Sequence, residues 1–447
     1  MTPSSIGWFG IFRLGLVQSA LGSIVVLTTS TLNRVMVVEL SLPAMLPGAL
    51  VALHYAVQIL RPRMGYGSDV GGRRTPWIIG GMAVLAVGGI LAALATAWMT
   101  DQLAAGVALA VLAFVLIGAG VGAAGTSLLV LLAKRVDSAR RAPAATIVWL
   151  MMIVGFAVTA TVAGQLLDPF SQARLIAVTA GVSVAAFLLT LLAVWNVEGA
   201  PDAGAKVVAT VAKPGFIDAL GEVWAEPASR QFTIFVFVSM IAYSAQDLIL
   251  EPFAGAVFAF TPGESTKLSG VQHAGVFVGM LLVALAGGAV LGRRFGSLKA
   301  WTVGGCLASA VALAGLTAAG MIGAAWPLKL NVFLLGMTNG AFAIAAIASM
   351  MSLAGAGRES REGIRMGLWG AAQAIAFGLG GFLGTLASDV ARIYLDTPDL
   401  AYATVFAAEA ALFVFSAVLA ARVGQPVLSK RPLEISTAGD GYIAGID

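Results

Sequence analysis

Long apolar stretches separated by short charged or turn-rich breaks run through almost the whole chain. The hydrocarbon core of a bilayer is about 30 Å thick, so a helix that spans it needs about 20 mostly apolar residues. Twelve windows match this pattern, at 14–36, 45–61, 77–98, 103–132, 144–166, 174–195, 231–254, 271–291, 300–322, 326–352, 365–388 and 401–421. Only α-helices satisfy every backbone hydrogen bond inside such segments, so the pattern predicts an all-α membrane protein with twelve transmembrane helices.

The longest polar connection, residues 196–230, divides the chain close to its middle. We therefore expect an N-terminal six-helix half at 1–195, a cytoplasmic linker at 196–230 and a C-terminal six-helix half at 231–422. Apolar residues between Phe216 and Trp224 share one helical face beside acidic ones, which indicates a short helix lying on the membrane surface. The segment 423–447 has no apolar period, so we expect a disordered cytoplasmic tail.

Composition agrees with a membrane protein, because 59% of the 447 residues are hydrophobic, 11% are charged and the mean hydropathy is +0.94. The net charge of +4 does not indicate nucleic acid as a partner, because the positions of the charges along the chain are more informative than the small excess of basic over acidic residues. With both termini inside the cell, all but five of the 26 Lys and Arg residues fall on the cytoplasmic side. This asymmetry predicts a multi-pass protein of the cytoplasmic membrane with both termini cytoplasmic.

A glycine-rich basic loop follows the second predicted span. Its pattern, G-x-x-x-D-x-x-G-R-R, comprises Gly65, Asp69, Gly72, Arg73 and Arg74. The glycines permit a tight reversal, and the aspartate can meet a neighbouring helix N-terminus while the arginines stay on the cytoplasmic face. The pattern resembles the loop signature of the major facilitator superfamily, and a degraded copy at 288–296 supports two repeats of six helices.

Five further strings lie in or beside the predicted spans: LNRVMVVEL at 32–40, QDLILEPF at 246–253, QHAGVF at 272–277, TNGAF at 338–342 and MGLWGAAQ at 366–373. Together they resemble the PucC family, the bacteriochlorophyll delivery branch of that superfamily. The resemblance runs from about Phe12 to Arg422 and implies an inner or intracytoplasmic photosynthetic membrane. It also implies (bacterio)chlorophyll as cargo and light-harvesting polypeptides as partners, with pigment-synthesis enzymes as further candidates. Hydropathy and spacing by themselves indicate no pigment.

Four charged residues lie at the ends of two repeat-related spans. Arg34 and Glu39 end the first span, and Asp247 and Glu251 end the seventh. A charge at the centre of a bilayer costs at least about 2.5–3.5 kcal/mol, so such residues need partners. We expect an ion pair from Arg34 to Asp247 or Glu251 that holds the two halves together on the extracytoplasmic side. Such a pair is a gate in one interpretation and a static clamp in the other.

The two histidines are the first candidates for contact with a pigment. His54 is expected near the cytoplasmic end of the second span, and His273 at the outer start of the eighth. A neutral imidazole can coordinate the magnesium of a chlorin, but a packed or hydrogen-bonded histidine is the competing interpretation. Asn339, Trp369 and Gln373 are further candidates, although buried amides and aromatic rings more often serve helix packing.

The sequence carries no recognisable catalytic or metal-binding motif. The single cysteine, Cys306, lies in an apolar segment, and the chain lacks an ATP-binding loop, a paired aspartate-rich motif and an H-E-x-x-H sequence. These absences argue against catalysis, and the resemblance to the PucC family implies the first hypothesis, a non-enzymatic factor that binds (bacterio)chlorophyll and delivers it during assembly of light-harvesting complexes. The alternative is a proton-coupled transporter of a small solute, with Glu409, Asp247 and Glu251 as candidate proton carriers.

Overall fold

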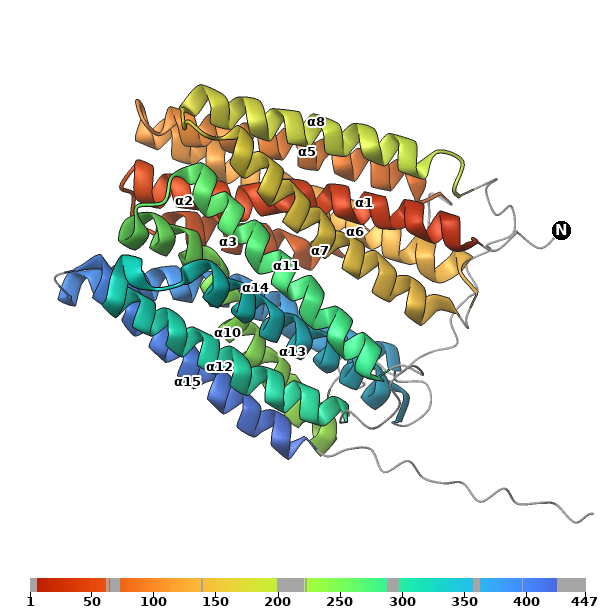
Figure 1. Ribbon diagram of the computed structural model, residues 1–447. Helices are drawn as coiled ribbons and strands as arrows, with labels where there is room; N and C mark the ends of the chain where they lie inside the picture. The colour runs from red at the N-terminus through yellow and green to blue at the C-terminus, as the bar shows by residue number, and fades with distance from the viewer. Residues whose placement is uncertain are drawn as a thin grey trace, which may run out of the picture.

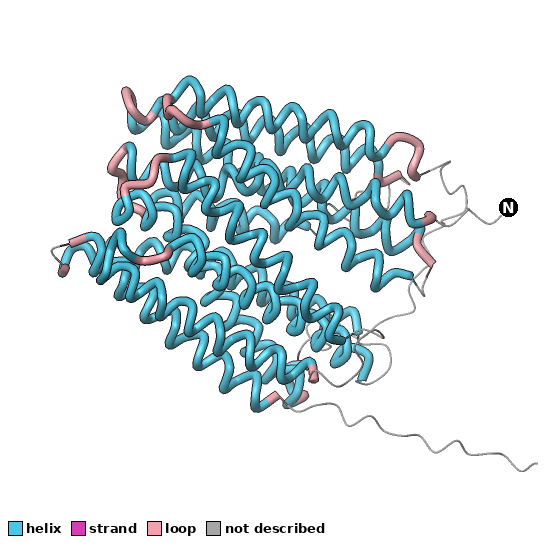
Figure 2. Tube along the Cα trace, in the orientation of Figure 1, coloured by secondary structure: helices cyan, strands magenta, loops and turns pink. Residues whose placement is uncertain are grey.

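The computed structural model describes residues 6–61, 64, 73–137, 140–198, 221, 223–287, 297–356, 362–395 and 397–423. Within these ranges every regular element is a helix, and Figure 2 shows helices joined by loops. The all-α prediction is confirmed. Most of the linker, most of the glycine-rich loop and the segment 424–447 lie outside the described residues, so the interfacial helix and the disordered tail stay predictions.

The helices up to residue 194 are α1 (Trp8–Val26), η1 (Leu27–Thr31), α2 (Leu32–Arg34), η2 (Val35–Glu39), α3 (Met45–Val57), η3 (Gln58–Leu60), α5 (Thr75–Trp98), α6 (Leu103–Arg135), α7 (Arg141–Leu166) and α8 (Gln172–Val194). The later helices are α10 (Pro227–Phe258), α11 (Pro262–Gly287), α12 (Leu298–Ile322), η6 (Gly323–Ala325), α13 (Leu328–Ala356), α14 (Glu362–Tyr394) and α15 (Pro398–Arg422). Eleven helices in the described part are long and apolar enough to cross a membrane, and the shorter apolar helix Met45–Leu60 lies at the position of the predicted second span.

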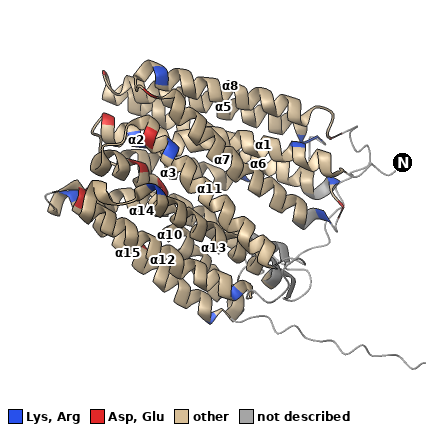
Figure 3. Ribbon diagram, viewed as in Figure 1, with Lys and Arg blue, Asp and Glu red and all other residues tan. Residues whose placement is uncertain are grey.

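The first membrane helix, Trp8–Glu39, begins six residues before the predicted start at residue 14. Arg13 therefore lies inside it, and its Nε donates to the Ala193 carbonyl at 3.0 Å, near the C-terminal end of α8. A cation is stabilised at that end of a helix, which explains why a charge does not end the span. Charged side chains lie mostly towards the two ends of the bundle, as Figure 3 shows for the described residues.

Helix α11 begins at Pro262, about two and a half turns before the predicted start at residue 271. A capping box fixes this start, because Glu264 Oε2 accepts from Thr261 N at 2.9 Å and Thr261 Oγ1 accepts from Glu264 N at 3.2 Å. A charged residue such as Lys267 indicates a loop when the sequence is read alone. In the structure its Nζ lies 2.9 Å from Asp168 Oδ2, and this ion pair neutralises the charge. The prediction that His273 opens its span is therefore wrong, since this residue lies about three turns inside α11.

Glycines allow the closest contacts between helices. A Cβ added to Gly81 of α5 would lie 2.6 Å from Ala124 N of α6, and one added to Gly120 of α6 would lie 2.6 Å from Leu85 N of α5. The backbones of these two helices therefore touch along their length, as small residues permit in a membrane where apolar lipid gives no hydrophobic drive for association. Glycines of α11 and α13 make the same kind of contact.

In Figure 1 the helices from α1 to α8 (red to yellow) occupy the upper part of the view, and α10, α12 and α15 occupy the lower part. The two groups meet where α7 packs along α11, where α3 packs along α14, and where the end of the first membrane helix contacts α10. We call α1 to α8 the first half and α10 to α15 the second half. The boundaries of the two six-helix halves at 195 and 231 stay predictions.

The first membrane helix is irregular where it meets α10. Its two segments η1 and η2 are π-helical, and the N–H of Leu40 donates to the Val35 carbonyl, five residues earlier, at 3.0 Å. A π turn holds an extra residue, so it rotates the following side chains relative to an α-helix, and such turns are frequent at functional sites. The apolar pattern of the sequence gives no sign of this irregularity.

Candidate functional site

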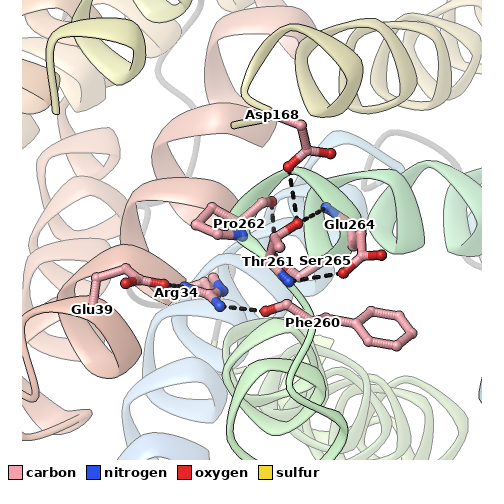
Figure 4. Close-up of polar contacts among 8 residues, drawn as sticks. All are labelled: Arg34, Glu39, Asp168, Phe260, Thr261, Pro262, Glu264 and Ser265. Carbon is pink, nitrogen blue, oxygen red and sulfur yellow. Dashed lines mark hydrogen bonds and ion pairs between the residues drawn. The ribbon is translucent and has the colours of Figure 1, made fainter. Parts of the chain in front are cut away.

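Arg34, only 2% exposed, reaches from the first membrane helix to the loop after α10. Its Nη1 lies 2.5 Å from Glu39 Oε1, and its Nη2 donates to the Phe260 carbonyl at 2.6 Å (Figure 4). The guanidinium passes over Gly255 of α10, where an added Cβ would lie 2.9 Å from Nη2. A charge-assisted hydrogen bond to a backbone carbonyl therefore ties the first helix to the second half.

The expected ion pair from Arg34 to Asp247 or Glu251 is not formed. Arg34 pairs with Glu39 instead, because the π-helical turn brings the side chain five residues onward to the same face. In an α-helix, residues three or four apart would share that face. The ion pair therefore lies within the first half, and hydrogen bonds connect the halves at this point.

Glu251 of α10 lies 1% exposed among hydroxyl groups from both halves. The Ser30 hydroxyl of η1 donates to Glu251 Oε1, and the hydroxyls of Ser265 and Thr266 of α11 lie beside the same carboxyl group. Thr31 Oγ1 and Thr266 Oγ1 are hydrogen-bonded at 3.0 Å. We call this group, Ser30, Thr31, Glu251, Ser265 and Thr266, the hydroxyl cluster. It joins η1 to α10 and α11.

Asp247, one turn earlier on α10, lies closer to the middle of the bundle. Its Oδ1 accepts from Gln272 Nε2 of α11 at 3.3 Å. Tyr55 of α3 and Tyr243 of α10 both pack on Phe377 of α14, with ring centroids 5.7 Å apart in each pair. A partly buried carboxyl group and two phenols therefore lie where the two halves meet.

Two further aspartates join the halves at the ends of helices. Asp389 of α14 accepts from the backbone N–H groups of Ala44 at 2.9 Å and Met45 at 2.7 Å, which caps the start of α3. Asp168, in the loop after α7, accepts from Lys267 Nζ and Thr261 Oγ1, each at 2.9 Å (Figure 4 shows the threonine contact). Partial burial would raise the pKa of Asp168, but these hydrogen bonds, the positive charge of Lys267 and the backbone N–H of Gly263 together hold the pKa below its ordinary value.

His273 of α11 lies where this helix packs against α7. Its Nδ1 is 2.8 Å from the Ser269 carbonyl oxygen, and its ring meets Phe156 of α7 edge-on, with centroids 4.9 Å apart. A carbonyl oxygen only accepts, so Nδ1 carries the proton and Nε2 of the neutral ring carries the lone pair. No protein group within the described residues hydrogen-bonds Nε2. This tautomer is the one that ligating histidines adopt.

His54 of α3 has the opposite arrangement. Arg61 donates to Gln58 Oε1, so the Gln58 amide nitrogen is turned towards His54 Nε2 and donates to it at 2.9 Å. The lone pair of the imidazole is therefore engaged, and the ring packs edge-on against Tyr55 with centroids 4.8 Å apart. His54 thus has the geometry of a hydrogen-bonded packing residue. The two histidines lie on different helices with different partners.

The three other pigment candidates belong to the interior of the second half. Trp369 is 1% exposed and packs edge-on against Phe232 of α10 at 4.9 Å, while Gln373 Nε2 lies 3.9 Å from Met240 Sδ. Asn339 is buried in α13, and its amide has no hydrogen-bond partner in the described part of the chain. The structure does not bring these three residues to either histidine in any contact that it describes.

Glu198, which belongs to none of the motifs in the sequence, holds the start of α5. Its carboxylate accepts from the backbone N–H groups of Arg74 at 2.6 Å and Thr75 at 2.8 Å. Burial would raise the pKa of Glu198, but these backbone hydrogen bonds hold it below the ordinary value. A glutamate 123 residues from the helix that it caps leaves no local signal in the sequence. Gly65, Asp69 and Gly72 of the loop pattern lie outside the described residues.

Among the residues that the structure describes, no group of three or more His, Cys, Asp or Glu side chains could hold a metal ion.

The family model described as PUCC protein matches residues 31–427. The chain is 55% identical over 421 residues to the protein named bacteriochlorophyll synthase 44.5 kDa chain of Rhodobacter capsulatus, covering 94% of this chain and 96% of that protein. It is 31% identical over 448 residues to protein PucC of Cereibacter sphaeroides, covering 95% of this chain and 94% of the relative.

Solved transporters share the fold at low sequence identity. The peptide transporter POT in complex with sulfate has a TM-score of 0.69 at 14% identity, covering 94% of this chain and 97% of that chain. The D-xylose-proton symporter has a TM-score of 0.68 at 13% identity, covering 93% of this chain and 98% of that chain. The fold is therefore of the major facilitator type. Sequence identity this low does not allow the function of these transporters to be assigned to this chain.

Proposed function

Because the chain belongs to the PUCC protein family, we propose that it binds (bacterio)chlorophyll within the membrane and delivers it to light-harvesting polypeptides. The relatives are named for bacteriochlorophyll synthase and PucC, which supports a membrane protein concerned with photosynthetic pigment. The fold and the apolar interior support cargo that enters from lipid rather than from water.

The observation that carries the proposal is the state of His273. Its Nδ1–H is held by the Ser269 carbonyl, which fixes the ring and leaves Nε2 as a ligand for the magnesium of a chlorin. The residue lies where α7 packs on α11, at a seam between the two halves. We infer that the pigment approaches along this seam, with its macrocycle against apolar side chains such as Phe156 and Phe277.

The proposal assigns the chain a carrier role and no catalytic one, although one relative is named as a chain of a synthase. A carrier needs a ligand, a lipid-facing path and a partner surface, and none of these requires a reacting group. We infer that pigment-synthesis enzymes are partners of the chain. Purified protein given a pigment precursor should therefore yield no esterified product without the enzyme.

The decisive experiment compares the two histidines. The chain, purified in detergent from a phototrophic host, should carry the absorption bands of bound pigment. His273→Leu should lose at least about nine-tenths of that absorbance per protein, because the axial ligand is removed. His54→Leu is the matched control and should keep the absorbance, because the lone pair of His54 is engaged by Gln58. Pigment retained in His273→Leu at the wild-type level would contradict the proposal.

A proton-coupled transporter is the second candidate function. It is favoured by Asp247, a partly buried carboxyl group between the halves beside Gln272, Tyr55 and Tyr243. Solute accumulation in proteoliposomes under a pH gradient, abolished in Asp247→Asn, would support transport and replace delivery as the preferred function.

A further inference from the structure

Three polar side chains are buried inside the second half, outside the hydrogen bonds that join the halves. Gln246 of α10, Asn339 of α13 and Glu409 of α15 are 0%, 1% and 5% exposed. Each has two side-chain oxygen or nitrogen atoms, and none of these atoms has a hydrogen-bond partner among the described residues. Buried polar atoms are nearly always paired, so three such side chains require a common explanation.

The core around them contains two pairs of phenylalanines at different depths. Phe253 of α10 meets Phe406 of α15 with ring centroids 5.0 Å apart, and Phe342 of α13 meets Phe413 of α15 at 6.0 Å. Glu409 lies between Phe406 and Phe413, three residues from one and four from the other, so all three share one face of α15. The carboxyl group therefore points into the core between the two aromatic pairs.

Gln246 and Asn339 point into the same core. Gln246 lies seven residues, or about two turns, before Phe253, and Asn339 lies three residues before Phe342. Their helix faces carry other members of the same buried cluster, including Ala242 on α10 and Leu335 on α13. Both amides therefore face the core that Glu409 enters.

The three side chains also lie at similar distances along their helices. The end of α10 and the starts of α13 and α15 lie on the same side of the bundle, because successive spans alternate in direction. Gln246 is 12 residues from Phe258, Asn339 is 11 from Leu328, and Glu409 is 11 from Pro398. Asn339 and Glu409 each lie about one turn before a ring of the Phe342–Phe413 pair, and Gln246 is next to Asp247, whose charge acts on Glu409. We infer that the three side chains share one region of this core.

Among the described residues, neither carboxyl oxygen of Glu409 has a basic partner. The Lys and Arg residues on α10, α12, α13 and α15 are Arg230, Lys299, Lys329 and Arg422, each within about one turn of a helix end. Arg392 of α14 donates to the hydroxyl of Tyr402, which lies about two turns before Glu409 on α15. Asp247, next to Gln246 on α10, lies close enough to act electrostatically on Glu409, and it is acidic as well. A bare carboxylate in this core would be strongly unfavourable, so it requires a bound positive charge or a proton.

We propose that Gln246, Asn339 and Glu409 bind one dehydrated Na⁺ ion inside the second half. Two amide oxygens and one carboxylate supply four hard oxygen ligands with a single negative charge, which matches a small monovalent cation. A divalent ion would bring an unbalanced charge. A proton would neutralise Glu409, but its O–H could donate to only one of the two amide oxygens, whereas a cation can contact both.

The test measures the thermal unfolding of the purified protein in detergent at fixed pH and ionic strength. Na⁺ replaces N-methyl-D-glucamine stepwise, with K⁺ as a parallel series. The unfolding temperature should rise with Na⁺ and reach a plateau, because a ligand that binds only the folded state stabilises it. K⁺ should give a smaller shift at the same concentration, because its larger radius fits the four oxygens less closely.

Three variants separate the site from general stability. Glu409→Gln and Asn339→Ser should weaken the apparent affinity for Na⁺ at least about tenfold, because each removes a ligand. Asn339→Ser is the milder change if Glu409→Gln is not recovered from the membrane. Asn331→Leu is the matched control, because this amide on the same helix is already bonded to Trp326 and the Ala312 carbonyl. It should lower the unfolding temperature and keep the full Na⁺ shift.

Two results would overturn the site. One is an unfolding temperature that does not change between Na⁺ and N-methyl-D-glucamine, or that follows pH alone, which would leave Glu409 protonated or hydrated without a metal. The other is a Na⁺-dependent rise in unfolding temperature that is the same in Asn339→Ser as in the wild type at every Na⁺ concentration. Neither result depends on bound pigment, so the Na⁺ site and the delivery proposal can fail independently.

Discussion

At the scale of single residues, the hydrogen bonds of an imidazole decide which nitrogen is available to a ligand. The Nδ1–H of His273 donates a hydrogen bond to a backbone carbonyl, whereas Nε2 of His54 accepts a hydrogen bond from an amide that Arg61 orients. The two residues look alike in the sequence, as single histidines in apolar spans. Only the neighbours one turn away, Ser269 and Gln58, distinguish a free lone pair from an engaged one.

The buried Arg34 gives a prediction at the same scale. Arg34→Ala should lower the free energy of unfolding by about 2–3 kcal/mol, because Glu39 and the Phe260 carbonyl both lose a charged donor. Glu39→Gln should cost about 1 kcal/mol, since this carboxylate is one-third exposed and screened by solvent. The double variant should cost less than the sum by about 1 kcal/mol, measured by denaturant unfolding in detergent.

The control for this cycle combines Arg34→Ala with Asp389→Asn. Asp389 caps α3 and shares no partner with Arg34 in the described contacts. The two costs should therefore add to within about 0.5 kcal/mol. Additive costs for Arg34 and Glu39 themselves would show that the ion pair contributes nothing.

At the scale of helices, two features of the backbone determine local packing: the π-helical turns of the first membrane helix and the glycine contacts between α5 and α6. The π-helical turns of η1 and η2 turn Ser30, Thr31 and Glu39 to faces that regular α-helical spacing would not give them. The glycines of α5 and α6 act differently, by letting two backbones touch. Both effects depend on backbone geometry rather than on hydrophobic pattern.

Two adjacent glycines on α5 allow a matched prediction. Gly81→Ala should lower the free energy of unfolding by about 1–3 kcal/mol, because its Cβ would lie 2.6 Å from the backbone nitrogen of Ala124. Gly80→Ala should leave stability unchanged or raise it by up to about 1 kcal/mol, because nothing lies within 4 Å of the added Cβ and alanine favours a helix. Thermal unfolding of the two purified variants compares them directly, and equal stabilities would contradict the close contact.

At the scale of the whole molecule, the contacts between the halves form a continuous set. Arg34, the hydroxyl cluster and Asp168 lie where the end of the first membrane helix meets α10 and α11. Binding and delivery require no opening of this set, whereas transport by rocking halves requires that it open. The distinction between a clamp and a gate can therefore be tested by covalent closure.

A disulfide across the hydroxyl cluster should leave pigment binding intact. Thr31 Oγ1 and Thr266 Oγ1 are 3.0 Å apart, so cysteines at these positions lie within reach of a bond. Thr31→Cys with Thr266→Cys, in a Cys306→Ser background, should keep the pigment absorbance per protein after oxidation. The same protein under reducing conditions is the control. Loss of pigment on oxidation and its recovery on reduction would indicate a gate and contradict the clamp.

Much of the fold follows from the sequence because hydrocarbon leaves few alternatives to the helix. The apolar windows predict the helices, and the glycine-rich loop predicts the superfamily that the solved transporters share. The predicted starts of the first and eighth spans are wrong by six and nine residues, since Arg13 and Lys267 lie inside the membrane helices rather than before them. The capping box at Thr261 and Glu264 is the signal that could have corrected the second boundary.

The sequence by itself determined that this protein is a helical membrane bundle, and which residues are charged or titratable within it. Tertiary structure alone decided that Arg34 meets Glu39, that Glu198 caps a distant helix, and that Nε2 of His273 has no hydrogen-bond partner among the described residues. The reason is physical. A span forms from local hydrophobicity and its own backbone hydrogen bonds, whereas the partner of a buried polar group depends on helix rotation and on atoms far away in the chain.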